Sequence, residues 1–529
     1  MTGEPAGGAR SRRSRDAVRP GASAAVARAL DELRARPRHL VLGALVAGML
    51  AAPLAPRPVL LTAGAAAVLG GRRGLALAAA FAVLAGAIGA QARLAALDRT
   101  ALPPLFGTTV TAPAVLLEQP RPARYGATAL AQLRGVRPAA ELGASAPGPA
   151  GVDADGPPAG AGERVLLRID SRVAWPPVPT GAIVALRGRL GPLGPFESYQ
   201  RLRGAHAAIS VAQAAPTGAT RGGPWRLVDV VRRRAEAALS TGLPPAQAAL
   251  LRGMALGEDE ALDPVTRDDF RASGLSHLLA ASGENVALLA ALALPLLAWL
   301  GLGLRGRQLG VLGLIALYVP LAGGGPSIQR AGVMGAATTV AALAGRPASR
   351  WYALLLAAAV TLALNPRASA DPGWQLSFAA VAAIALLAPG LRRRLRARRV
   401  PSRLAEAAAV SAAATLGTAP LIALHFSQLS LVSLPANLLA APAVAPIMWL
   451  GMLAAAVGQL APALALPLNV CNAFLLGYVG WVAHTAAGLP HANVHAGLGG
   501  PAALAAVYAA IAFAAGVARM LARRLPRLP

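Results

Sequence analysis

Lysine is missing from this chain of 529 residues, and cysteine, aromatic residues and charge are all scarce. The single cysteine, Cys471, excludes an intramolecular disulfide and a thiolate metal cluster. Charged residues make up 14% of the chain, whereas a soluble globular protein usually carries about a quarter. Aromatic residues contribute 4%, so the apolar part is mainly alanine, leucine, valine and glycine, a composition that lets helices approach closely in lipid.

What the chain has in abundance is apolar sequence. Hydrophobic residues make up 55% of it, the mean hydropathy is +0.53, and several uncharged stretches approach or exceed the length that spans a bilayer. A large soluble protein with an alanine-rich core does not account for such stretches. The formal net charge is +27, and many arginines lie beside apolar stretches, as expected of topology signals. The arginines elsewhere would attract a polyanion.

The distribution of polar and apolar sequence divides the chain into six parts. An arginine-rich tail, expected to be cytoplasmic, precedes three apolar segments at 39–55, 57–70 and 74–91. Strand-like sequence follows, then an amphipathic helical connector, a long apolar region and a second cytoplasmic tail. The predicted boundaries are 1–38, 39–95, 96–225, 226–275, 276–522 and 523–529.

The polar region 96–225 is predicted to be a small β-rich domain. Apolar and polar residues partly alternate in four stretches, which turns rich in proline and glycine separate. Residues 136–163 have few apolar side chains to bury, so we expect a flexible insert there. The size suits a five-stranded barrel of OB type, although another small β-fold fits the same pattern. The predicted strands are 108–118, 127–133, 164–171 and 182–190.

Nine further apolar segments follow, and the loops between them alternate in charge. Arginines in every second loop and at the C-terminus place both termini in the cytoplasm and the β-rich domain outside. The predicted fold is therefore mainly α: a polytopic transmembrane helical bundle of about 10–12 spans, with an extracellular OB-like domain inserted after the third span. The nine segments are 276–302, 308–322, 328–345, 351–364, 374–390, 403–424, 430–457, 463–488 and 500–522.

Four segments of the apolar region contain polar residues, glycine and proline. Polar or irregular backbone at membrane depth persists only where protein buries it or water reaches it, so each segment is a functional candidate. Arg330 either snorkels to the interface or faces an aqueous path, and both interpretations stay open. Pro435, Pro442 and Pro446 predict a broken or re-entrant helix. Candidate path residues are His277, Ser282, Asn285, Ser327, Gln329, Arg330, Gln375, Ser377 and Asn437, and candidate helix-break positions are Gly283, Pro326, Pro372, Gly373 and Pro435.

Other polar groups give weaker signals for chemistry. The acidic run 258–260 and the pair His491 and His495 each lack the further ligands of a metal site, so a solvated helix end and a solvated loop are favoured. Cys471, inside an apolar run, is interpreted as a small buried residue. No Walker A pattern, glycine-rich nucleotide loop or serine-hydrolase elbow occurs. We therefore expect no enzymatic activity, no metal and no cofactor.

The polar segments resemble the competence domain of the ComEC/Rec2 family of DNA internalisation-related competence proteins. The resemblance starts with LLRGMALGEDEALDP at Leu250, continues through the SG, NP, DPG, QLSF and PAN motifs, and keeps their order over residues 250–460. GERVLLRID, GAIVALRGRL and PFESYQRLRGAHA resemble the OB-like N-terminal domain of the family. Many relatives have leucine and histidine in place of Glu284 and Asn285. Many also carry a C-terminal metallo-β-lactamase-like domain, whose HxHxDH cluster this sequence lacks.

The resemblance implies an inner-membrane channel that passes single-stranded DNA into the cytoplasm during natural transformation. It implies a multi-pass protein of the bacterial plasma membrane that works with a DNA receptor, a cytoplasmic helicase-like ATPase and a separate nuclease. Two alternatives stay open: a transporter of a small solute or lipid precursor on the same fold, and a degenerate homologue that transports nothing. The large outer domain favours DNA, since a solute carrier rarely needs one.

Overall fold

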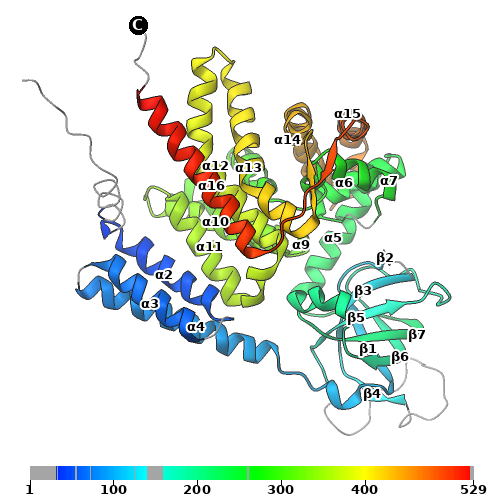
Figure 1. The fold of residues 1–529 in the computed structure, drawn as a ribbon. Helices are drawn as coiled ribbons and strands as arrows, with labels where there is room; N and C mark the ends of the chain where they lie inside the picture. The colour runs from blue at the N-terminus through cyan, green and yellow to red at the C-terminus, as the bar shows by residue number, and fades with distance from the viewer. Residues whose placement is uncertain are drawn as a thin grey trace, which may run out of the picture. The chain divides into compact units, whose positions relative to one another are not determined.

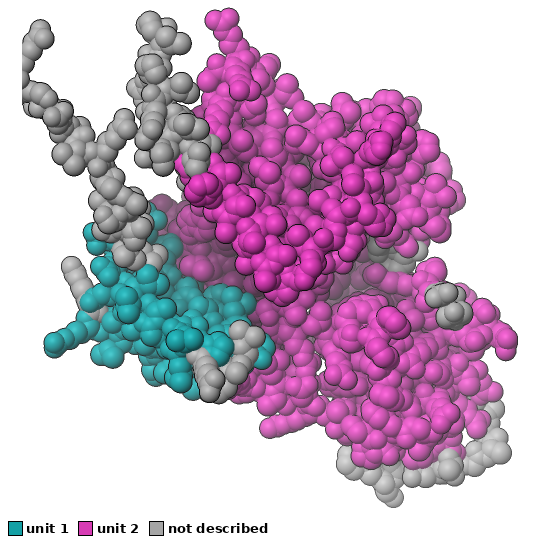
Figure 2. Space-filling view, in the orientation of Figure 1, with its two compact units in different colours: residues 1–88 teal, residues 89–529 magenta. Residues whose placement is uncertain are grey.

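The computed structural model describes residues 31, 34–53, 56–71, 73–123, 126–139, 159–258 and 261–524. The predicted tails at 1–38 and 523–529 lie mostly outside these residues. The chain forms two compact units, Met1–Ile88 and Gly89–Pro529 (Figure 2). Helices predominate, and all but two short strands belong to one sheet in the described part (Figure 1). The prediction of a mainly α fold with a small β-rich part is therefore confirmed.

The first unit contains α2 (Pro37–Ala51), α3 (Pro56–Gly70) and most of α4 (Arg73–Leu97). Glycine lets α2 and α4 pack with their backbones in contact. A Cβ atom at Gly48 would lie only 2.0 Å from the carbonyl oxygen of Val83, so no larger residue fits without a shift of one helix. The small residues thus serve close helix packing, as the composition predicts.

Five strands of the second unit close into a barrel. They are β1 (Thr109–Leu116), β3 (Gly126–Leu133), β5 (Arg164–Ile169), β6 (Ala182–Gly191) and β7 (Ala205–Thr220). Each pairs with two others in the order β1–β3–β5–β7–β6–β1, and only β5 and β7 are parallel. This closed five-stranded arrangement is an OB-type barrel. Its apolar core includes Leu116, Leu133, Leu167, Leu186 and Ile209.

The sequence pattern predicts four of these strands and misses β7. This strand is rich in alanine and contains Pro216 and Gly218, all residue types that strands tend to avoid. Its first half is nevertheless enclosed, with Ala207 and Ile209 fully buried, because it pairs with β5 on one side and β6 on the other. Pairing with distant strands thus overrides a poor local propensity.

The segment 136–163, predicted to be a flexible insert, is structured at both ends. Short strand β4 (Arg137–Pro138) pairs with β1, and a bridge joins Val136 to Ala159. At the other end, the Glu163 carboxylate accepts a hydrogen bond from the Ala101 N–H at 2.8 Å, which holds it against the start of the barrel. Residues 140–158 lie outside the described part of the chain.

Three helices occupy the region of the predicted connector. They are α5 (Pro224–Ser240), α6 (Pro245–Leu256) and α7 (Pro264–Ala272). Asp263 caps α7 by accepting a hydrogen bond from the Thr266 N–H, as its position before a proline predicts. Buried residues of these helices belong to the same apolar core as residues of the apolar helices that follow.

The described residues after 276 form nine apolar helices, and each coincides with a predicted segment. Among the residues that the structure describes, five helices, α4 among them, are long and apolar enough to cross a membrane, and the others are shorter or less apolar. The predicted number of spans stays a prediction. The nine helices are α8 (Gly283–Trp299), α9 (Leu304–Leu321), α10 (Pro326–Leu343), α11 (Arg350–Leu364), α12 (Pro372–Ala397), α13 (Ser402–Phe426), α14 (Ser433–Val457), α15 (Leu466–Ala487) and α16 (Pro501–Arg524).

Two predictions about this region are wrong. α14 is one continuous helix rather than a broken or re-entrant one. Pro435 lies in its first turn, where no helical partner is needed, and Pro442 and Pro446 lie in its interior, where neighbouring helices of a membrane domain make proline tolerable. Cys471 is exposed on α15 rather than buried, because an apolar residue of a membrane helix can face lipid as well as protein.

Candidate functional site

The first of the four polar segments, residues 270–289, contains the end of α7, a short 3-10 helix and the start of α8. α8 begins at Gly283, several residues after the predicted start at 276. His277 lies before it in the short 3-10 helix η4 (Ser276–Leu278), with an exposed side chain. Ser282 is the N-cap residue, whose Oγ accepts a hydrogen bond from the Glu284 N–H at 3.3 Å. Gly283 is therefore the start of the helix rather than a break within it.

Asn285 joins three helices through its side chain. It is buried, and its Nδ2 donates to the Met254 carbonyl oxygen at 2.9 Å and to the Tyr318 hydroxyl at 3.1 Å. The Tyr318 hydroxyl donates in turn to the Ala255 carbonyl at 2.6 Å. The asparagine thus fixes α8 against the end of α6 and against α9, and it satisfies backbone carbonyls that the end of α6 leaves free.

Arg330 is the centre of a second cluster, built from α8, α10 and α12. Its Nη1 donates to the Ser377 carbonyl oxygen, and its guanidinium lies 5.8 Å from the centre of the Phe378 ring. The hydroxyls of Ser327 and Ser377 are 2.9 Å apart beside it. A Cβ atom at Gly283 would lie 2.6 Å from Nη2 of Arg330, so the glycine makes room for the arginine. Four of the predicted positions therefore meet here.

Three further path candidates, Gln329, Gln375 and Asn437, bond mainly to backbone. Gln375 donates to the Ser369 carbonyl at 2.8 Å and contacts Nε2 of His425 at 2.8 Å. Gln329 donates to the Gly324 carbonyl at 2.7 Å. Asn437 donates to the carbonyl of Ser433 in its own helix, also at 2.7 Å.

The predicted helix-break positions are all helix starts. Pro326 and Pro372 are the first residues of α10 and α12, and Gly373 is the second residue of α12. Pro435 lies in the first turn of α14. Proline is favoured in the first turn because its missing N–H would have no partner there. These residues therefore set where the helices begin, at the end of the domain that carries the Arg330 cluster.

The barrel is attached to this same end of the helical domain. The loop between β6 and β7 contains the 3-10 helix η3 (Pro195–Arg203), which contacts η5 (Pro366–Ala370) between α11 and α12. Asn365 joins them: its Nδ2 donates to the Leu202 carbonyl at 2.7 Å. Arg367 forms an ion pair with Asp98 at the end of α4. The sequence marked Asn365 only as part of a motif and gave no signal that it binds the barrel.

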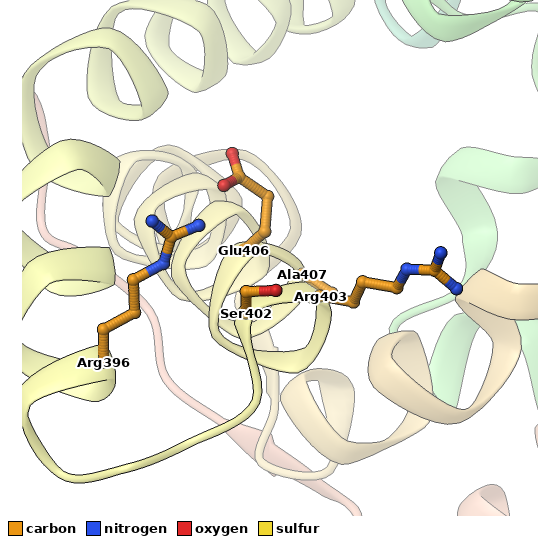
Figure 3. Close-up of a pocket in the computed structure, with 5 residues that line it drawn as sticks. All are labelled: Arg396, Ser402, Arg403, Glu406 and Ala407. Carbon is orange, nitrogen blue, oxygen red and sulfur yellow. The ribbon is translucent and has the colours of Figure 1, made fainter.

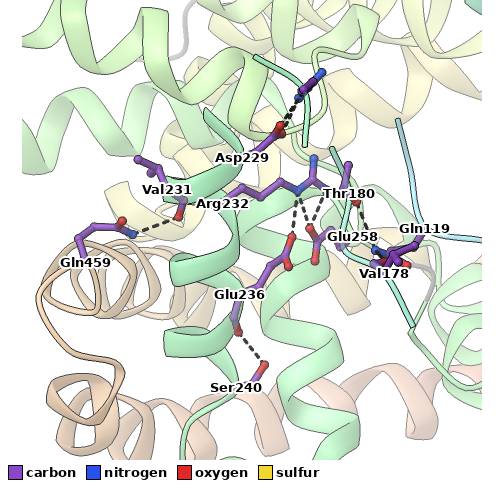
Figure 4. Close-up of polar contacts among 11 residues, drawn as sticks. Gln119, Val178, Thr180, Asp229, Val231, Arg232, Glu236, Ser240, Glu258 and Gln459 are labelled. Carbon is purple, nitrogen blue, oxygen red and sulfur yellow. Dashed lines mark hydrogen bonds and ion pairs between the residues drawn. The ribbon is translucent and has the colours of Figure 1, made fainter. Parts of the chain in front are cut away.

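A partly buried ionic network lies where α5 leaves the barrel (Figure 4). Arg232 contacts Glu236 at 3.1 Å and Glu258 at 2.6 Å. Burial, together with a hydrogen bond from Glu236, raises the pKa of Glu258 to about 7. Asp229, 2% exposed, pairs with Arg221 at 2.6 Å. Glu258 is therefore part of a packed network rather than the solvated helix end that the sequence favours, and residues 259–260 of the same acidic run lie outside the described part of the chain.

Two buried asparagines on α15 escape the sequence analysis. Asn469 donates to the Ala238 and Thr241 carbonyls at 2.8 Å each, so it caps the end of α5. Asn472 donates to the Ile447 carbonyl of α14 at 3.2 Å. Both are fully enclosed. The signal that could have found them is the occurrence of two asparagines in an otherwise apolar run, which marks the face of α15 that contacts protein.

An open basic cleft of about 430 Å³ lies where α12 ends and α13 begins (Figure 3). Arg396, Ser402, Arg403, Glu406 and Ala407 line it. In Figure 3 the Arg396 and Glu406 side chains approach the same space, whereas Arg403 points away from it. Glu406 also pairs with Arg392 at 2.8 Å. Among the described residues, no group of three histidine, cysteine or acidic side chains could hold a metal ion.

Comparison with known proteins gives two matches. The sequence profile of the Competence protein family matches residues 254–521. ComE operon protein 3 of Bacillus subtilis (strain 168) is 29% identical over 200 residues, which cover 38% of this chain and 25% of that protein. The chain thus aligns with about a quarter of the length of this curated relative. No solved structure matches the chain.

Proposed function

The chain belongs to the Competence protein family, and we propose that it is a plasma-membrane channel through which single-stranded DNA enters the cytoplasm during natural transformation. The observation that carries the proposal is the OB-type barrel held at the polar end of the helical domain by Asn365. Barrels of this type bind single-stranded nucleic acid by stacking and positive charge. A carrier of small solutes rarely needs such a module.

The surface of the barrel that would receive the strand is η3. Phe196 is 95% exposed and Tyr199 is 56% exposed. They are three residues apart in a 3-10 helix, whose three-residue turn places both on one face. Exposed aromatic rings on one face are a stacking surface for bases of any sequence, and exposed Arg201 adds positive charge for the phosphates. Because η3 contacts η5, this surface adjoins the helical domain.

Beyond the barrel, the strand would pass the polar ends of the helices. Ser282, Ser327 and Ser377 offer hydroxyls there, and Arg330 offers a positive charge. Asn285, Gln329 and Asn437 bond backbone carbonyls, so their proposed role is to hold the helix ends that border the path. We propose transport rather than catalysis, with the energy, the DNA receptor and the nuclease supplied by partners.

The test is deletion of the gene and measurement of nuclease-protected labelled DNA inside the cells. Deletion should abolish uptake, and the intact chain should restore it. A double variant, Phe196→Ala with Tyr199→Ala, should still fold and reach the membrane, because both rings are exposed. It should nevertheless restore uptake poorly, because the proposed stacking surface is lost. The matched control, Phe513→Ala, removes an exposed ring of α16, 74% exposed, and should restore uptake fully.

Uptake that persists in the deletion strain would contradict the proposal. That result would favour the two other readings of the chain, a transporter of a small solute or lipid precursor and a homologue that transports nothing. Loss of viability or of cell-envelope integrity on deletion would separate the first of these from the second.

A further inference from the structure

Arg330 is a buried cation without a counter-ion. Its side chain is 5% exposed, and in the described part of the chain no ion pair includes it. Among the described residues, the Ser377 carbonyl is the one acceptor of a hydrogen bond from its guanidinium, and its Nε is buried without a partner there. Arginine is almost never buried unless it is paired, because removal of the charge from water is costly. The Ser377 carbonyl and the Phe378 ring offset part of this cost, and no described carboxylate neutralises the charge.

Two helix N-terminal ends add positive potential around Arg330. Gly283, the first residue of α8, lies against Nη2, and the N-terminal end of a helix carries partial positive charge. Arg330 itself is in the second turn of α10, near the N-terminal end of that helix. Glu284 is the nearest acidic residue along α8, but its side chain is exposed and it forms no ion pair with Arg330. A helix start, a guanidinium and two serine hydroxyls together form an arrangement that binds oxyanions.

From this geometry we infer that Arg330, the start of α8 and the hydroxyls of Ser327 and Ser377 form a binding site for one phosphate group, which a phosphodiester of the DNA strand occupies during passage. The inference rests on the proposed function and adds a specific site to it. In the described part of the chain, four of the five guanidinium N–H groups remain free to donate, and two of them suit the two non-bridging oxygens of a phosphodiester. A lipid headgroup offers the same phosphate chemistry, and the binding experiment below separates the two sources.

Gly283 gives the site its shape. A methyl group at this position would lie 2.6 Å from Nη2 of Arg330, closer than any real contact, so Gly283→Ala would displace the guanidinium without a change in charge. The same variant would leave the start of α8 intact, since alanine is compatible with the first turn of a helix and position 283 does not have a left-handed backbone. Charge and geometry can therefore be tested separately.

The experiment measures binding of a fluorescein-labelled oligothymidylate to the purified full chain in lipid nanodiscs over a series of NaCl concentrations. Arg330→Gln should weaken binding about ten- to a hundredfold, as expected for loss of charge-assisted hydrogen bonds. It should also reduce the slope of log K against log salt by about 0.7, the contribution of one phosphate on a single strand. Gly283→Ala should weaken binding with all charges kept, and Glu284→Gln, the matched control, should leave binding equal or stronger.

An uncharged methylphosphonate oligonucleotide supplies the second arm. It should bind the wild-type chain and the Arg330→Gln variant equally, which also shows that the variant is folded. An unchanged salt slope in Arg330→Gln, or equal weakening by Glu284→Gln, would overturn the inference. So would an effect of Arg330→Gln on binding of phosphatidylglycerol alone, with oligonucleotide binding unaffected, because the site would then belong to lipid. A failure of the proposed function would be seen in a different experiment, as DNA uptake that persists after gene deletion. That result does not depend on these binding constants.

Discussion

At the scale of single residues, identical side chains have different roles that depend on their neighbours. Asn285 bonds to the backbone of α6 and the hydroxyl of α9, Asn469 caps α5, and Asn437 bonds only to its own helix. All three occur in apolar sequence, where polar residues are expected to be functional. The sequence shows that each needs a partner but not where that partner lies, because the partners of the first two come from distant parts of the chain.

The pKa of Glu258 predicts how the stability of the protein depends on pH. Burial raises it from the ordinary value of 4.5 to about 7, so the folded state holds the proton more tightly than the unfolded state does. The free energy of unfolding should therefore fall as pH rises from 4.5 to about 7 and change little outside that window on account of this group. Glu258→Gln should remove this part of the dependence, measured as the thermal midpoint of the purified chain at each pH.

A matched control exists on the next helix. Asp268 is a largely exposed acidic residue, 70% exposed at its side chain, which pairs with Arg271. Asp268→Asn should leave the pH dependence as it is in the wild-type chain. A Glu258→Gln variant whose midpoint falls with pH as steeply as that of the wild type would show that Glu258 titrates normally.

At the scale of elements, the helices begin where proline and glycine stand in the sequence. Pro326, Pro372 and Pro435 each lie in a first turn, and the caps Asp263 and Asp371 accept N–H groups of their helices. These signals are local, so the sequence predicts them well. The barrel attachment is not local: η3 and η5 meet although more than 150 residues separate Leu202 from Asn365. No pattern of propensity or hydropathy carries that information.

Asn365→Ala should loosen the attachment of the barrel. The variant loses the hydrogen bond to the Leu202 carbonyl, worth about 1 kcal/mol, so the amides of η3 should exchange with deuterium about fivefold faster. It also loses the cap in which the Asn365 Oδ1 accepts a hydrogen bond from the Arg367 N–H at 3.1 Å. Ser369→Ala is the control on the same 3-10 helix, because the Ser369 hydroxyl bonds only to the Pro366 carbonyl within η5. Equal exchange rates of η3 in both variants would mean that Asn365 does not hold the barrel.

At the scale of the whole molecule, the second unit combines a closed barrel with helices whose outer surface exposes large apolar side chains. Phe474 on α15 is 77% exposed and Trp299 at the end of α8 is 81% exposed, which suits surroundings of lipid. In the barrel β5 and β7 are parallel neighbours, although β6 lies between them in the sequence. The membrane class follows from composition, whereas this closure follows from contacts between distant strands.

The arrangement of the helices across the membrane can be tested with single cysteines in a Cys471→Ala background, which removes the exposed native thiol. Ser171→Cys in the barrel and Ser369→Cys in η5 should react with an impermeant maleimide from outside intact cells. Ser402→Cys at the start of α13 should react only after permeabilisation, because α12 separates it from η5. Labelling of Ser369→Cys and Ser402→Cys from the same side would mean that α12 does not cross the membrane.

The sequence by itself determined the class of protein, the position of nearly every helix, four of the five barrel strands and the segments where polar residues gather. These features depend on hydropathy, periodicity and turn residues, which act over a few residues. Only the tertiary structure decided the closure of the barrel through β7, the continuity of α14, the outward position of Cys471 and the meeting of Gly283, Ser327, Arg330 and Ser377. In lipid both faces of a helix are apolar, so hydropathy cannot say which face meets protein, and contacts between distant segments settle it.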